Sequence, residues 1–87
     1  MERYEPYYAD DTQGVHFEVG VDGAYVQAHV SKQVMTSRYG LPVGFHEWVE
    51  AYRAHKEEIN ACVVRTAKAH GRTIVILQLK DLERWSR

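Results

Sequence analysis

Residues 14–31 read GVHFEVGVDGAYVQAHVS, and this stretch determines how the fold begins. Apolar and polar residues alternate on both sides of Asp22-Gly23, which is the periodicity of two β-strands. Asp-Gly favours a type I′ turn, because both central residues of that turn have positive φ. We therefore predict a β-hairpin whose six apolar side chains share one face. The predicted pairs are Val15 with Val30, Phe17 with Ala28, and Val19 with Val26.

Two helices are predicted after the hairpin. Ser31 is a good N-cap for a helix of about two turns, and Gly40 followed by Pro42 is a stop signal. Residues 45–70 contain no Pro or Gly and carry apolar residues at helical spacing, which predicts one long amphipathic helix that ends at Gly71. At the rise of an α-helix this segment is roughly 39 Å long. It is longer than the sheet it must cover, so we expect one end to overhang or fray.

Residues 73–79 form a β-branched and apolar run, which predicts a third strand buried at least partly on both faces. We expect this strand to be central in the sheet or to lie under a cover, and Asp81 to cap a final helical turn. The predicted order ββααβ implies a two-layer α+β domain, with both helices on the apolar face of an antiparallel or mixed sheet. We treat residues 1–87 as a single domain, with an N-terminal segment (1–13) and a core (14–82).

Composition supports a globular domain. Of 87 residues, 45% are hydrophobic and 26% are charged, which excludes a disordered tail or a collagen-like chain. The single cysteine, Cys62, cannot form an internal disulfide. No apolar stretch approaches the ~20 residues of a membrane helix, and the acidic, tyrosine-rich N-terminus is unlike a signal peptide, so we expect a cytoplasmic protein.

Charge is divided unevenly along the chain. Residues 1–64 hold five Lys/Arg and ten Asp/Glu, whereas residues 65–87 hold six and two. This division can mark an anionic partner for the basic end, or complementary surfaces within one fold or between two copies of it. We favour complementary surfaces.

The residues that carry these patterns resemble the small bacterial family known as domain of unknown function 1488. The similarity covers about residues 14–82, and it implies a compact cytoplasmic ββααβ domain of bacterial origin with no activity, cofactor or site residue to transfer. The N-terminal tyrosines and the basic tail lie outside the similar part. The similar residues are Gly14 to Phe17, Asp22-Gly23, Val26 to Ser31, Phe45 to Arg53, Ile59, Ala67, Gly71 and the closing strand to Asp81-Leu82.

Two histidine patterns could bind a metal. His46-Glu47 begins like a zincin helix, but Glu50 stands where the second histidine belongs, so we interpret this segment as an exposed acidic face with an Arg53–Glu57 ion pair.

The predicted hairpin register also places His16 directly opposite His29 on its outer face, flanked by Glu18 and Gln27. Two ligands do not make a site, and a third would have to come from Tyr25, Glu18 or the N-terminal segment. We therefore predict two half-exposed strand histidines without a metal.

No pattern of a catalytic site is found in the sequence. Cys62 lies in the apolar stripe of the long helix and is expected to be a buried, inert thiol. The sequence contains neither a glycine-rich phosphate loop nor a Ser/His/Asp pattern. We predict a protein that is not an enzyme and has no cofactor.

Both faces of the third strand need burial, so we expect a second copy or the chain's own N-terminus to cover the outer face of the sheet. We predict a small protein-interaction module that forms a homodimer, with the tyrosine segment ordered against the sheet or the partner. The candidate partner surface comprises Tyr4, Tyr7, Tyr8, Ile74, Ile76 and Trp85.

The alternative is an accessory nucleic-acid-binding protein that uses the basic C-terminal end, with Trp85 available to stack on a base. The ten acidic residues upstream argue against strong binding. Its candidate residues are Arg65, Lys68, Arg72, Lys80, Arg84 and Arg87.

Overall fold

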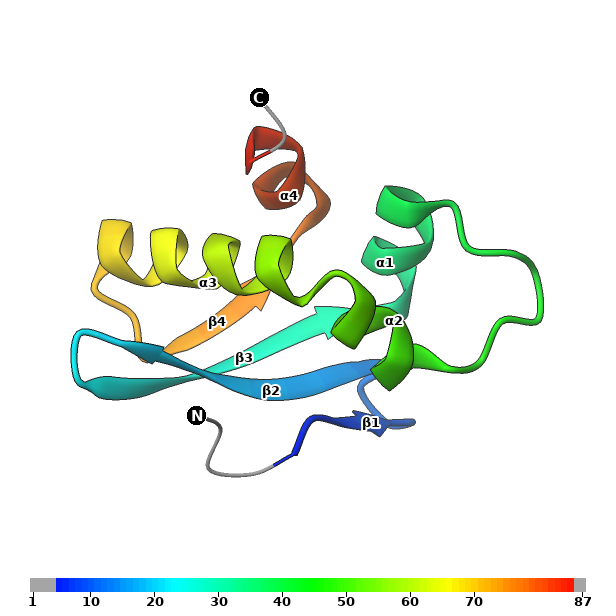
Figure 1. Ribbon diagram of the computed structural model, residues 1–87, viewed down its shortest axis with the longest axis horizontal. Coiled ribbons are helices and arrows are strands. Elements are labelled where there is room, and N and C mark those ends of the chain that lie inside the picture. Colours follow the sequence, from blue (N-terminus) through cyan, green and yellow to red (C-terminus); the bar gives the residue numbers. More distant parts are fainter. Residues whose placement is uncertain (1–4, 86–87) are drawn as a thin grey trace.

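The structure is a computed structural model that describes residues 5–85, and of residues 84 and 85 it describes only the backbone. It is a mixed α+β fold of two layers, in which the helices cover one face of a sheet with strand order β1-β2-β3-β4 (Figure 1). The predicted fold class is therefore confirmed. In chain order the elements are β1 (Tyr7–Ala9), β2 (Gly14–Val21), β3 (Ala24–Ser31), α1 (Lys32–Tyr39), α2 (Trp48–Ala54), α3 (Lys56–His70), β4 (Ile74–Leu77) and α4 (Leu79–Trp85).

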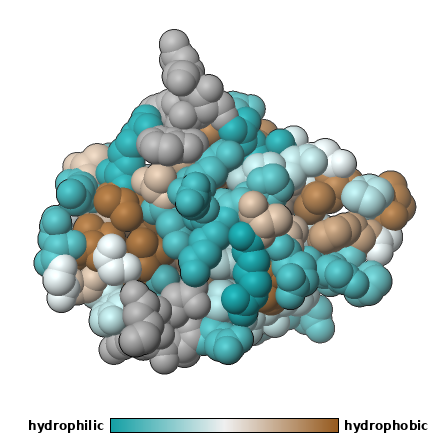
Figure 2. Space-filling model, viewed as in Figure 1, coloured by the Kyte–Doolittle hydropathy of each residue, from teal (hydrophilic) through white to brown (hydrophobic). Residues whose placement is uncertain are grey.

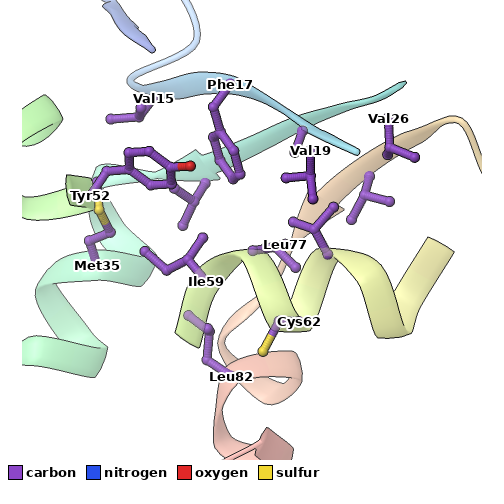
Figure 3. Close-up of a cluster of buried hydrophobic side chains, with 14 of the residues drawn as sticks. Val15, Phe17, Val19, Val26, Met35, Tyr52, Ile59, Cys62, Leu77 and Leu82 are labelled. Carbon is purple, nitrogen blue, oxygen red and sulfur yellow. The ribbon is translucent and has the colours of Figure 1, made fainter. Parts of the chain in front are cut away.

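The predicted hairpin is confirmed in its register. Strands β2 and β3 pair antiparallel, with Phe17 opposite Ala28, and the turn residues Asp22 and Gly23 have φ of 52° and 83°. Positive φ at both positions is the geometry of a type I′ turn. The six apolar residues of the hairpin are all buried, and they form the sheet side of the core (Figure 3).

The first helix also follows its sequence signals. The side-chain oxygen of Ser31 accepts the backbone N–H of Val34 at 3.0 Å, as an N-cap should. Gly40 has φ of 64°, in the left-handed region, and its N–H donates to the carbonyl of Thr36. Helix α1 therefore begins and ends where its cap residues predict.

The prediction of one helix over residues 45–70 is wrong. The helix begins at Trp48 and breaks at His55, where φ is −117° and ψ is 24°. The N–H of His55 donates to the carbonyls of Ala51 and Tyr52, which ends α2. The carbonyl of His55 accepts the N–H of Ile59, which begins α3.

The helices on either side of the break contact different strands: α2 contacts β1 and β2, and α3 contacts β2, β3 and β4. The bend lets the Tyr52 ring lie 4.4 Å from the Phe17 ring, while α3 crosses β2, β3 and β4 (Figures 1 and 3). The imidazole of His55 stacks on Tyr39 with ring centroids 3.6 Å apart.

The third predicted strand is present but is neither central nor buried on both faces. Strand β4 pairs parallel with β3 at an edge of the sheet. Val75 and Leu77 are buried, whereas Ile74 and Ile76 are each 63% exposed. The crossover through α3 returns the chain beside β3, and the helices cover only one face there. An apolar run alone cannot reveal that asymmetry.

Two further elements complete the fold. Residues 7–9 of the N-terminal segment form β1, which pairs antiparallel with β2 at the other edge. At the C-terminus, Asp81 is the third residue of α4 and not the residue before the helix, as its prediction as a cap implied; its carboxylate accepts the N–H of Gln78 at 2.9 Å. Residue 79, predicted as strand, begins this helix, and Leu82 brings it against Cys62 of α3 (Figure 3).

Candidate functional site

The outer face of the sheet carries Tyr7, the β4 isoleucines and both strand histidines. The strand pairings place Tyr7, His16, His29 and Ile76 in one row across all four strands. The next row contains Glu18, Gln27 and Ile74. We call Ile74 and Ile76 the β4 patch.

The N-terminal tyrosines divide between the two faces of the sheet. Tyr7 lies on the outer face, where its ring stacks on His16 at a centroid distance of 5.2 Å. Tyr8 points to the helical side and stacks on Trp48 at 6.3 Å. The sequence grouped these tyrosines with the β4 patch, but only Tyr7 shares its face. Tyr4 and the side chain of Trp85 lie outside the described residues.

The two strand histidines meet as the register predicts, with ring centroids 4.7 Å apart. Nε2 of His16 lies 2.8 Å from the hydroxyl of Thr12, whereas Nε2 of His29 is buried and has no hydrogen-bond partner. Burial and, second, the neighbouring His16 lower the pKa of His29 below 6.5, although the Thr12 backbone partly opposes them.

Gly14 makes room for this arrangement. A Cβ at this position would collide with the His29 ring and with the carbonyl oxygen of Val30. Sequence reasoning missed both Thr12 and Gly14. The available signal was Gly14 itself, a glycine at the start of a strand, which often marks a close approach of another group.

Within residues 5–85, no three His, Cys, Asp or Glu side chains lie close enough together to hold a metal ion. Glu18, one possible third ligand, is buried and accepts a hydrogen bond from the amide of Gln27. His46 precedes α2 instead of lying on it. The predicted Arg53–Glu57 pair is wrong: the break at His55 separates these residues, and Arg53 pairs with Glu5 at 3.1 Å.

The thiol of Cys62 is buried against α4, and it donates to the carbonyl of Asp81 at 3.5 Å. Burial first, and the carboxylate of Glu58 second, raise its pKa to about 11. The thiol therefore stays protonated at neutral pH, which makes it a poor nucleophile.

The described basic residues near the end of α3 border two different hollows. Lys68 and Arg72 border a hollow of about 480 Å³ that also contains Asp22, and Lys68 pairs with this aspartate at 3.6 Å. Arg65 borders a different hollow, next to Cys62. The side chain of Arg84 lies outside the description. The Lys68–Asp22 pair joins the acidic and basic halves of the sequence within one chain.

A further hollow of about 630 Å³ lies beside the loop between α1 and α2. Polar residues such as Thr12 and Lys32 line one side, and Phe45 and Trp48 line the other. In Figure 2, apolar side chains gather over this loop, at the right of the view. The sequence of this loop indicates a helix stop and does not predict the hollow.

Comparison with known proteins adds a family but no activity. A family model described as "Protein of unknown function (DUF1488)" matches residues 2–77. The match therefore includes the N-terminal segment that the sequence-based similarity over residues 14–82 left out. No curated protein and no solved structure matches the chain.

None of the helices within residues 5–85 combines the length and the apolar character needed to cross a bilayer.

Proposed function

Because the chain belongs to the DUF1488 family, whose function is unknown, we propose its role from its own surface: it is a non-catalytic protein-interaction module that associates with a second copy of itself. The observation that carries this proposal is the β4 patch. Two isoleucines are each 63% exposed, side by side, on the outer face of a strand that is paired on one side only.

The patch is energetically costly unless something covers it. Full burial of an isoleucine side chain is worth roughly 1.5–3 kcal/mol, which is a large share of the stability of a small domain. The described N-terminal strand β1 cannot supply the cover, because it lies at the opposite edge of the sheet. We therefore propose that a partner covers the β4 patch.

A second copy fits the edge of β4. Two identical edge strands can pair antiparallel about a two-fold axis, which forms a closed dimer. Directly opposed residues of antiparallel strands project from the same face. A two-fold axis at Val75 then sets Ile74 of one copy opposite Ile76 of the other and gathers four isoleucines on the outer face. The buried Val75 side chains meet on the helical side.

The test compares two substitutions of exposed apolar residues by lysine. Ile76→Lys places a charge in the β4 patch, whereas Val43→Lys changes a fully exposed valine in the loop between α1 and α2. We expect the wild-type chain and Val43→Lys to be dimers by light scattering at high concentration. Ile76→Lys should be a folded monomer, with its fold checked by circular dichroism.

A wild-type chain that stays monomeric at high concentration contradicts self-association. A dimer that survives Ile76→Lys places the interface elsewhere on the molecule. Either result removes the β4 patch as the basis of the function.

Nucleic-acid binding remains the alternative. The exposed residues Arg65, Lys68 and Arg72 near the end of α3 favour it, while the ion pair of Lys68 with Asp22 weakens it. Fluorescence anisotropy with duplex DNA at increasing salt separates the two functions. We expect weak binding, because a tight complex requires many phosphate contacts and loses affinity steeply with salt.

A further inference from the structure

The two strand histidines, Thr12 and Tyr7 form a compact cluster between β1 and the rest of the sheet. His16 is held from three sides, by Tyr7 of β1, by the hydroxyl of Thr12 and by the ring of His29. The hydroxyl of Thr12 also lies 3.5 Å from the carbonyl of Ala9, the last residue of β1. The end of β1 is therefore attached to the sheet through a histidine.

The two imidazoles differ in how they can accept a charge. The Thr12 oxygen can accept an N–H from His16, so a protonated His16 keeps its hydrogen bond. The buried Nε2 of His29 has no acceptor, and its ring packs against Gly14 without space for a compensating group. A proton added at Nε2 of His29 therefore has no acceptor and lies beside another imidazole.

Among the described groups that face His29, the Thr12 backbone offsets this charge only in part. Strand β2 presents His16 directly opposite and Glu18 one pair further along, where the carboxylate binds the amide of Gln27. Strand β4 presents the uncharged Ile76, and the turn before β2 presents Thr12. Strand β1 contributes the phenol of Tyr7, which contacts His16.

We propose that the His16–His29 pair is a pH-sensitive clamp, which holds β1 on the sheet while His29 is neutral and loosens it when His29 becomes protonated. Strand β1 is the element that yields, because it is three residues long and pairs only with β2. Its release uncovers the edge of β2, a second surface on which a strand can pair.

The direction of the pH effect follows from linkage. The pKa of His29 is lowered from 6.5 in the folded chain, so the unfolded or locally opened chain binds the proton more readily. Stability conferred by the neutral pair is present above about pH 6.5 and decreases as the pH falls below it.

Amide hydrogen exchange tests the clamp in the full chain. We expect the protection factors of the β1 amides that point toward β2 to fall between neutral pH and about pH 5, because the pKa of His29 is lowered in the folded chain. Amides in the middle of the β2–β3 hairpin, such as Ala28, should keep their protection. His29→Gln should abolish the pH-dependent fall, and the matched variant His46→Gln, which changes an exposed loop histidine, should retain it.

Protection of β1 that does not change with pH overturns the proposal, as does a fall that persists in His29→Gln. A second measurement covers the case in which His29→Gln does not fold. In the wild-type chain, the midpoint of the fall must coincide with the NMR titration of the His29 ring protons. A midpoint that follows His46 or the carboxylates of Asp10 and Asp11 instead refutes the clamp.

Discussion

The two edges of the sheet are constructed in opposite ways. At one edge, β1 is short and anchored by side chains, with Tyr7 on His16 and Tyr8 on Trp48. At the other edge, β4 exposes Ile74 and Ile76. Short edge strands discourage pairing with other chains, whereas an exposed apolar edge invites it. The comparison shows that a single sheet can protect one edge and offer the other, and it is the reason why we place self-association at β4.

The largest effect is expected in β4, where buried and exposed side chains alternate. Leu77→Ala should lower the free energy of unfolding by about 2–5 kcal/mol, because Leu77 is 2% exposed and its loss leaves a cavity under α3. Ile76→Ala on the same strand is the control, since it changes a side chain in contact with water. Urea denaturation of the monomer measures both, and equal losses would show that the outer face of β4 is covered within the chain.

An intermediate effect is expected at the β1 edge. Gly14→Ala should cost about 1–3 kcal/mol, because the new Cβ meets the His29 ring and lies 2.6 Å from the carbonyl oxygen of Val30, a backbone atom that cannot move freely.

Gly20→Ala is the matched control on the same strand. Its Cβ meets nothing within 4 Å, so the change should stay within about 1 kcal/mol. Thermal or urea melts of the two variants measure the difference between their free energies of unfolding. If Gly14→Ala and Gly20→Ala lower the stability equally, the His29 ring does not pack on Gly14, and the β1 edge of the sheet is less tightly packed.

The smallest effect is expected at the ion pair between Glu5, which precedes β1, and Arg53 of α2. Glu5→Gln should change the free energy of unfolding by no more than about 0.5 kcal/mol, because the Glu5 side chain is 87% exposed and water screens its pair with Arg53. The measurement is again a urea melt, at low and at high salt. A loss above 1 kcal/mol that salt removes would mean that charge, and not aromatic stacking, anchors β1.

Several features of the fold follow from local chemistry in the sequence. Asp22-Gly23 specified both the turn and the register, and that register alone placed His16 opposite His29. Ser31 and Gly40 marked the ends of α1 in the same way. These signals act between near neighbours in the chain, so they do not depend on what packs above them.

Other features needed the assembled molecule. Residues 7–9 are too few to show a strand period, and they become β1 only because the edge of β2 is there to receive them. The polar neighbour of His16 was missed for a related reason. Thr12 reaches the imidazole through a turn in which Gln13 takes a positive φ of 55°, which no motif in the sequence announces.

The sequence by itself determined the hairpin, its register, the first helix and the fold class, since turn chemistry, capping and alternation are local properties. Only the tertiary structure decided that the helix breaks at His55 and that β4 is an edge strand. Both outcomes depend on distances between segments far apart in the chain. Tyr52 of α2 packs on Phe17 of β2 while α3 crosses the other strands, and Ile74 and Ile76 stay exposed because all the packed helices lie on the other face of the sheet.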